Sequence, residues 1–121
     1  MTTTNPRIFG QAKPVQLIPV TLCTIPLAAG AQISLFVCNQ DSTVDQFSIE
    51  LIPSGDSPDP SRYIAYLTPI LGNAVFAVAG VSMSSGDSIV VVSTNGNCSF
   101  TATGFEPVSY THLTLPTKRI V

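Results

Sequence analysis

Turn-forming residues cut this chain into short segments, and that spacing most constrains what it can fold into. Ten prolines and eight glycines gather with Asn, Asp and Ser between runs that are rich in β-branched and apolar residues. No segment of about twelve residues repeats its apolar positions with the 3.6-residue period of a helix. We therefore expect strands over residues 15–25, 32–39, 47–51, 62–67, 74–79, 89–92 and 98–105.

Three of these runs predict how their side chains are buried. Ile33, Leu35 and Val37 alternate along the second run, so they should share one face of a strand. Residues 47–51 alternate apolar and polar side chains, which is typical of a half-buried strand. Residues 89–92 are continuously apolar, which indicates a strand buried on both faces.

The turns between the runs carry further predictions. Pro19 interrupts the first run and indicates an edge strand or a bend, and residues 26–30 should form a turn. The Asn-Gly pair within residues 94–97 predicts a hairpin that joins the last two strands. Together, strands and turns predict an all-β fold: a single antiparallel β-sandwich or jelly-roll-like domain of about seven to eight strands.

Composition and charge exclude several classes of function. Only 10% of the residues are charged, well below the roughly 25% usual for soluble domains, which suggests that part of the surface packs against another molecule. The net charge of −2 argues against a nucleic-acid partner. No apolar run approaches the roughly 20 residues of a membrane helix. The polar N-terminus lacks a signal-peptide pattern, so we expect folding in the cytoplasm where the chain is made.

The chain divides into three parts by composition. Residues 1–14 are polar and contain prolines, which indicates a flexible N-terminal arm; residues 15–107 hold the β-sandwich domain. Residues 108–121 resemble the translation of a transposase-based sequencing-library adapter, so we expect this tail to be non-native. Without the tail, residues 1–107 carry three basic and seven acidic residues, a net charge of −4.

Nucleophilic catalysis has little support in this chain. The only histidine, His112, lies in the tail, as does the only basic pair, Lys118 and Arg119. The domain therefore offers no Ser-His or Cys-His pair. Its thiols are more simply small buried side chains, although a bridge between neighbouring strands stays open for two of them. The cysteines are Cys23, Cys38 and Cys98, with the possible bridge between the last two.

The carboxylates are too dispersed to predict a metal or hydrolase site. Asp56 and Asp59 are candidates for weak calcium binding with loop carbonyls, but solvated loop charges explain them more simply. Asp41 and Asp45 are interpreted as turn and strand-start residues. Glu50 lies in mid-strand without the second acid that glycoside hydrolysis needs. We expect no catalytic, cofactor-binding or metal-binding residue.

Two tyrosines and one loop are the candidates for ligand binding. Tyr63 and Tyr66 have rings that could stack on sugars. They lie three residues apart and should occupy opposite faces of an extended strand, one in the core and one at the surface. The loop at residues 54–62 would be the presenting loop, since loops positioned by a rigid scaffold often carry binding residues.

Six motifs follow one another in an order that resembles a family of small tailed-phage virion structural proteins. Each motif alone is ordinary strand-and-turn sequence, and their succession across residues 1–107 carries the likeness. A cysteine at position 23 replaces the family's usual aromatic residue, so no contact made there is carried over. The motifs are Leu22-Cys-Thr-Ile-Pro26, Val37-Cys-Asn39, Tyr63-Ile-Ala-Tyr66, Gly72-Asn-Ala-Val-Phe76, Met83-Ser-Ser-Gly-Asp87 and Asn97-Cys-Ser-Phe-Thr-Ala-Thr-Gly-Phe-Glu106.

The resemblance implies a β-sandwich component of the virion without catalytic residues. The expected function is capsid decoration. The alternative is a tail or fibre accessory protein, of which a carbohydrate-binding receptor module is one form. The expected partners are further copies of the chain, with a trimer favoured, and other virion proteins such as the major capsid protein. The arm at residues 1–14 would then order on a neighbouring subunit.

Overall fold

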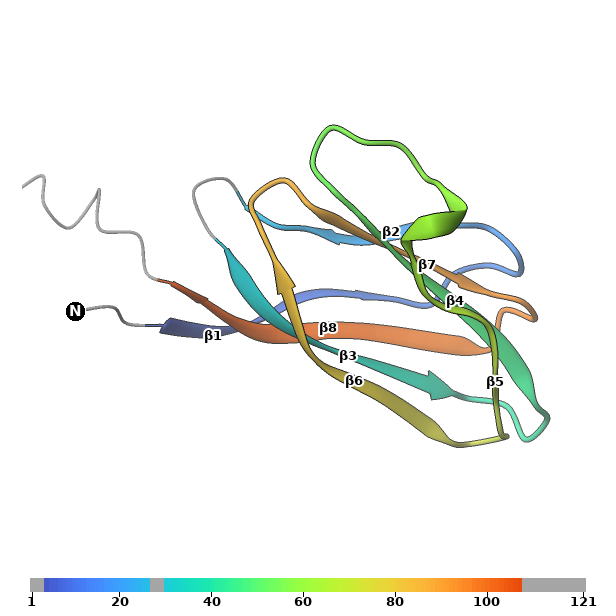
Figure 1. Ribbon diagram of the computed structural model, residues 1–121. Coiled ribbons are helices and arrows are strands. Elements are labelled where there is room, and N and C mark those ends of the chain that lie inside the picture. Colours follow the sequence, from blue (N-terminus) through green and yellow to red (C-terminus); the bar gives the residue numbers. More distant parts are fainter. Residues whose placement is uncertain (1–3, 27–29, 108–121) are drawn as a thin grey trace, which may run out of the picture.

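The computed structural model describes residues 4–26 and 30–107, which form two antiparallel four-stranded sheets (Figure 1). One sheet has the strand order β1-β8-β3-β6 and the other the order β2-β7-β4-β5. A short 3₁₀ helix, η1, precedes β5. The elements are β1 (Thr4–Ala12), β2 (Val20–Thr24), β3 (Ala31–Asn39), β4 (Asp45–Ile52), η1 (Pro60–Arg62), β5 (Tyr63–Ile70), β6 (Val75–Met83), β7 (Ser88–Ser93) and β8 (Cys98–Pro107).

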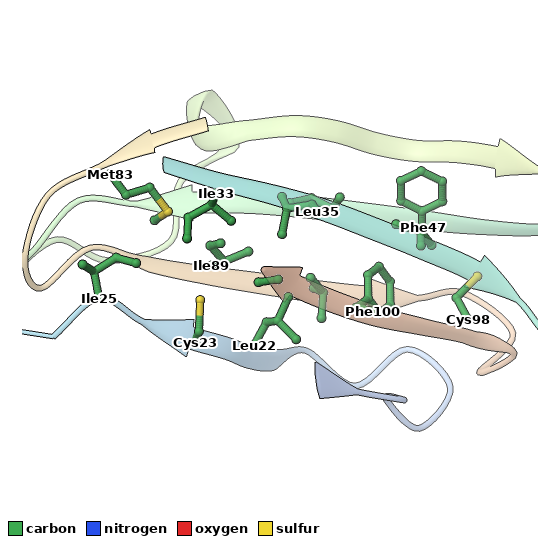
Figure 2. Close-up of a cluster of buried hydrophobic side chains, with 14 of the residues drawn as sticks. Leu22, Cys23, Ile25, Ile33, Leu35, Phe47, Met83, Ile89, Cys98 and Phe100 are labelled. Atoms are coloured by element: carbon green, nitrogen blue, oxygen red, sulfur yellow. The ribbon is translucent and has the colours of Figure 1, made fainter. Parts of the chain in front are cut away.

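The two sheets pack face to face, and their inward side chains form the core (Figure 2). The prediction for β3 is confirmed, because Ile33, Leu35 and Val37 are each at most 1% exposed. Phe47 of β4 packs edge-on against Phe100 of β8, with ring centroids 6.3 Å apart. The predicted all-β sandwich is therefore confirmed, with eight strands in the described part of the chain.

The N-terminal segment is part of the sandwich, so the prediction of a separate arm at residues 1–14 is wrong for the part that the structure describes. Thr4–Ala12 forms β1 and pairs with β8 along its whole length. The prolines misled the interpretation, because Pro6 lies on an edge strand, where a missing N–H is tolerated. At the register shift, Gly10 approaches the backbone of Leu22 so closely that a Cβ would lie 2.0 Å from its carbonyl oxygen.

The segment after β1 confirms one prediction and leaves another untested. β2 is an edge strand of its sheet, as Pro19 predicted, and it begins only after that proline. The turn expected at residues 26–30 falls largely outside the described residues. So does the tail at residues 108–121, including His112, Lys118 and Arg119.

The hairpin predicted from the Asn-Gly pair is wrong. β7 and β8 lie in different sheets, so the turn at residues 94–97 carries the chain across the sandwich. Gly96 does adopt the left-handed backbone that such a turn needs, with φ of 80°. The backbone N–H groups of Asn95 and Asn97 donate to the Asp45 carboxylate, at 2.9 and 3.2 Å. These contacts with a distant residue position the turn without strand pairing across it.

Two burial predictions for the β2-β7-β4-β5 sheet are also corrected. On β4 the outward residues Ser48 and Glu50 are buried, at 4% and 5% exposed, because β5 and the loop between β4 and β5 cover them. On β7, Ile89 and Val91 are fully buried, but the two valines on the other face are only half-buried. This sheet is therefore partly covered on its outer side.

Candidate functional site

Asp45 forms a buried polar cluster at one end of the sandwich. Its carboxylate is 0% exposed and accepts hydrogen bonds from Ser93 Oγ at 2.8 Å and from the backbone N–H of Gln46 at 2.7 Å, besides those of the β7–β8 turn. Burial alone would raise the pKa of Asp45, but the hydrogen bonds together hold that pKa below its usual value. Asp45 begins β4 as predicted, and the cluster gives it a structural role.

The three cysteines form no disulfide, and burial makes two of them poor nucleophiles. Burial raises the pKa of Cys23 to about 11, and burial with the neighbouring Asp45 raises that of Cys98 to about 12. Both thiols stay protonated near neutral pH and are poor nucleophiles. Cys38 is half-buried on the outer face of its sheet, whereas Cys98 points inward, so a bridge between them is excluded. The expectation that all three thiols are buried is wrong for Cys38.

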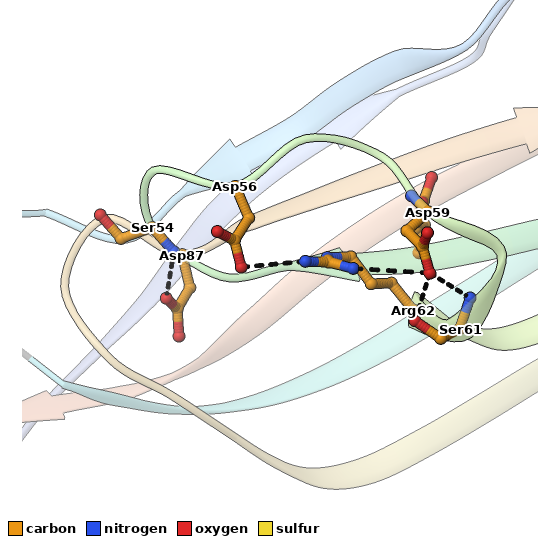
Figure 3. Close-up of polar contacts among 7 residues, drawn as sticks. Ser54, Asp56, Asp59, Ser61, Arg62 and Asp87 are labelled. Atoms are coloured by element: carbon orange, nitrogen blue, oxygen red, sulfur yellow. Dashed lines mark hydrogen bonds and ion pairs between the residues drawn. The ribbon is translucent and has the colours of Figure 1, made fainter.

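The loop between β4 and β5 is organised around Arg62 (Figure 3). Its guanidinium Nη2 lies 2.9 Å from Asp56 Oδ2, and Nη1 lies 3.7 Å from Asp59 Oδ2. Asp59 also caps η1 by accepting the Ser61 N–H at 2.9 Å. The two aspartates proposed for calcium are thus paired with an arginine. The described residues contain no group of three or more side chains that could hold a metal ion.

Tyr63 and Tyr66 share one face, so the prediction that they point to opposite faces is wrong. Their ring centroids are 4.8 Å apart in an edge-to-face arrangement. The β4–β5 register explains this, because Tyr63 lies opposite Glu50 and Ala65 lies opposite the residue that precedes Glu50. Ile64 is therefore an extra residue without a partner on β4. Such a bulge shifts the alternation by one position. The sequence gives no signal for it.

The two tyrosines and Pro60 line an open pocket of about 380 Å³. Tyr66 is 63% exposed, and Tyr63 is half-buried. Burial raises the pKa of Tyr63, and the nearby Glu50 carboxylate adds to that effect. The Tyr63 hydroxyl therefore stays protonated near neutral pH and can donate a hydrogen bond. We call this feature the tyrosine pocket.

The outer face of the β1-β8-β3-β6 sheet carries no charged side chain within the described part of the chain. Four large apolar side chains stand out on it, and the rest are hydroxyl, amide, thiol or small residues. We call this surface the uncharged face. By register and exposure it comprises Pro6, Ile8, Gln11, Gln32, Ser34, Phe36, Cys38, Val75, Ala77, Ala79, Ser82, Ser99, Thr101, Thr103 and Phe105.

Exposure on this face is substantial for its large side chains. Ile8 is 58% exposed, Phe36 41%, Val75 65% and Phe105 53%. The charged groups lie elsewhere: Arg7 pairs with Glu106 at 3.0 Å near one end of the sheet. A contiguous surface of this kind is a candidate for protein contact. Low charge in the sequence hinted at it, but its location depends on strands far apart in the chain.

Comparison with known proteins does not assign this chain to a family. No protein-family model matches this chain, and no curated protein matches it. The likeness to tailed-phage virion proteins therefore stays a prediction from the sequence motifs. No helix of the described residues has the length and apolar character that crossing a membrane requires.

Proposed function

We propose that this protein is a non-enzymatic structural component of a tailed-phage virion, with capsid decoration as its role. The uncharged face is the observation that carries the proposal. Four large apolar side chains on this face are exposed to water, and burying them against another surface lowers the free energy. They are Ile8, Phe36, Val75 and Phe105. A subunit that works by packing into an assembly needs such a face and needs no catalytic residues.

A second copy of the chain suits this face. Residues 1–107 carry a net charge of −4, so most contacts between copies bring like charges together. The uncharged face avoids that repulsion. Four strands about 4.8 Å apart and about eight residues long give an area of roughly 500 Å². A contact that covers this face and an equal area of a neighbouring copy buries roughly 1,000 Å², the size at which specific interfaces begin.

The proposed partners are thus further copies, in a trimer by the family resemblance, and the major capsid protein. The chain would fold in the host cytoplasm and then join the virion. A place on the tail or a fibre is the second candidate. The motif resemblance supports both, and the absence of charge on an extended sheet face favours lattice packing.

Purified virions test this proposal. For a phage that encodes the chain, mass spectrometry of purified virions should detect it in many copies, in the capsid fraction after heads and tails are separated. Phe36→Lys and Phe105→Lys should each reduce binding to capsids at least tenfold, because each buries a charge in the contact. Leu71→Lys, a similar change away from the face, should bind normally. Virions without the protein would overturn the proposal, and its recovery only with tails would replace decoration with the tail role.

A further inference from the structure

The tyrosine pocket lies on the sheet opposite to the uncharged face, so the proposed assembly does not use it. Tyr63 and Tyr66 pack edge to face, and Tyr66 keeps 63% of its surface exposed. The volume of about 380 Å³ falls within the roughly 300–1,000 Å³ of small-molecule sites, which combine aromatic walls with a few polar groups. Two tyrosine rings beside a proline offer apolar ring surface together with two phenolic hydroxyl groups.

A buried carboxylate accompanies the pocket. Glu50 is 5% exposed and is the register partner of Tyr63 on the outer side of β4. Its Oε2 accepts the Asp59 N–H at 2.8 Å, which ties the sheet to the loop that ends in Pro60. A carboxylate has about four acceptor sites, and this bond occupies one of them. Glu50 thus links β4 to the loop beside the pocket and adds negative charge near Tyr63.

The loop beside the pocket is fixed by specific contacts. Asp56 and Asp59 pair with Arg62 (Figure 3), and Ser54 N–H donates to Asp87 Oδ1 at 2.9 Å, joining the loop to the β6–β7 turn. With Glu50, whose carboxylate accepts the Asp59 N–H, three carboxylates and one guanidinium lie in or beside this loop. The surroundings of the pocket are therefore net negative and held in place before a ligand arrives.

The backbone of β5 is distorted where it presents the tyrosines. Leu67 has φ of 46°, a conformation that is uncommon for a bulky residue and costs free energy. Its N–H donates to the Oγ of buried Ser48 at 3.0 Å, which stabilises that conformation. The extra residue Ile64 places Tyr63 and Tyr66 on the same face, and this second irregularity follows directly after Tyr66.

From these observations we infer that the tyrosine pocket binds the pyranose ring of a neutral sugar. A pyranose has an apolar C–H face that can stack on the Tyr66 ring, and hydroxyls that can exchange hydrogen bonds with the tyrosine hydroxyls. The carboxylates near the pocket disfavour sialic and hexuronic acids, because their carboxylates would meet like charge. A virion subunit with this pocket would contact neutral glycans on its outer side.

Sugar titration of the full chain tests the inference. We would add glucose, galactose, mannose and N-acetylglucosamine to ¹⁵N-labelled protein and follow amide resonances, with N-acetylneuraminic acid and glucuronic acid as acidic counterparts. At least one neutral sugar should shift the resonances of Tyr63 and Tyr66 saturably, and the acidic sugars should bind at least tenfold more weakly. Tyr66→Ala should weaken binding at least tenfold, whereas Tyr66→Phe should retain most of it.

A matched control separates stacking from a general loss of apolar surface. Leu71 is 70% exposed and lies outside the pocket, so Leu71→Ala should bind the sugar like the wild type. Because Tyr66 is largely exposed, Tyr66→Ala should keep the wild-type thermal midpoint within a few degrees; if it does not, Tyr66→Ser and Tyr63→Ala serve in its place. Three results would overturn the inference. The first is that no neutral sugar saturates the protein up to 50 mM (about the weakest binding the titration resolves). The others are equal binding of acidic sugars and binding of a proline-rich peptide instead.

Discussion

At the scale of single residues, Asp45 joins more separate segments by hydrogen bonds than any other polar side chain described above. Its carboxylate joins the start of β4 to Ser93 and to the turn that leads into β8. In Asp45→Asn the amide keeps one acceptor oxygen but directs its NH₂ group at N–H donors. We expect the free energy of unfolding in urea to fall by about 2–4 kcal/mol. Asp41→Asn, the same change in a partly exposed turn, should have a much smaller effect.

Asp45 also makes the stability of the fold depend on pH. Because the pKa of Asp45 is lowered in the folded state, its contribution to stability is present above the unfolded value of about 3.9. That contribution is lost as the pH falls through the lower folded value. The wild type should thus lose stability on acidification below about pH 4, and Asp45→Asn should lose less over that range. Parallel stability curves for the two proteins would contradict this role for Asp45.

At the scale of elements, β8 makes a close backbone contact with β3 at Gly104. It lies between β1 and β3, and a Cβ on Gly104 would stand 1.9 Å from the carbonyl oxygen of Gln32. Gly104→Ala should therefore force the two strands apart and lower the free energy of unfolding by about 2 kcal/mol or more.

Gly30→Ala is the matched control for that substitution. There the added Cβ meets only the Met83 carbonyl oxygen, at 3.4 Å, so urea denaturation should show little change. If Gly104→Ala proved as stable as Gly30→Ala, the close approach of β8 and β3 would be wrong.

The elements also show where sequence interpretation succeeds and where it stops. β3 was predictable because Ile33, Leu35 and Val37 encode their burial locally. The turn at residues 94–97 was misread because its path depends on Asp45, some fifty residues away. Tyr63 and Tyr66 were placed on opposite faces because a bulge, which arises from pairing with β4, leaves no local pattern. Long-range pairing thus limited the prediction of both the fold and the pocket.

At the scale of the whole molecule, charge and apolar exposure are distributed unevenly over the two sheets. The loop and turns on the β2-β7-β4-β5 side carry acidic groups with Arg62, whereas the uncharged face has none among its described residues. The low charge of the sequence predicted that some surface would be covered. Only the register of four strands from distant parts of the chain reveals which surface that is.

The oligomeric state of the full chain in solution tests the central claim, that the uncharged face packs against further copies. Sedimentation velocity across micromolar concentrations should show a defined oligomer for the wild type. Phe36→Lys combined with Phe105→Lys should give a folded monomer, because the contact would then have to bury two charges. A wild type that stays monomeric throughout, or an oligomer that both lysines leave intact, would contradict the claim.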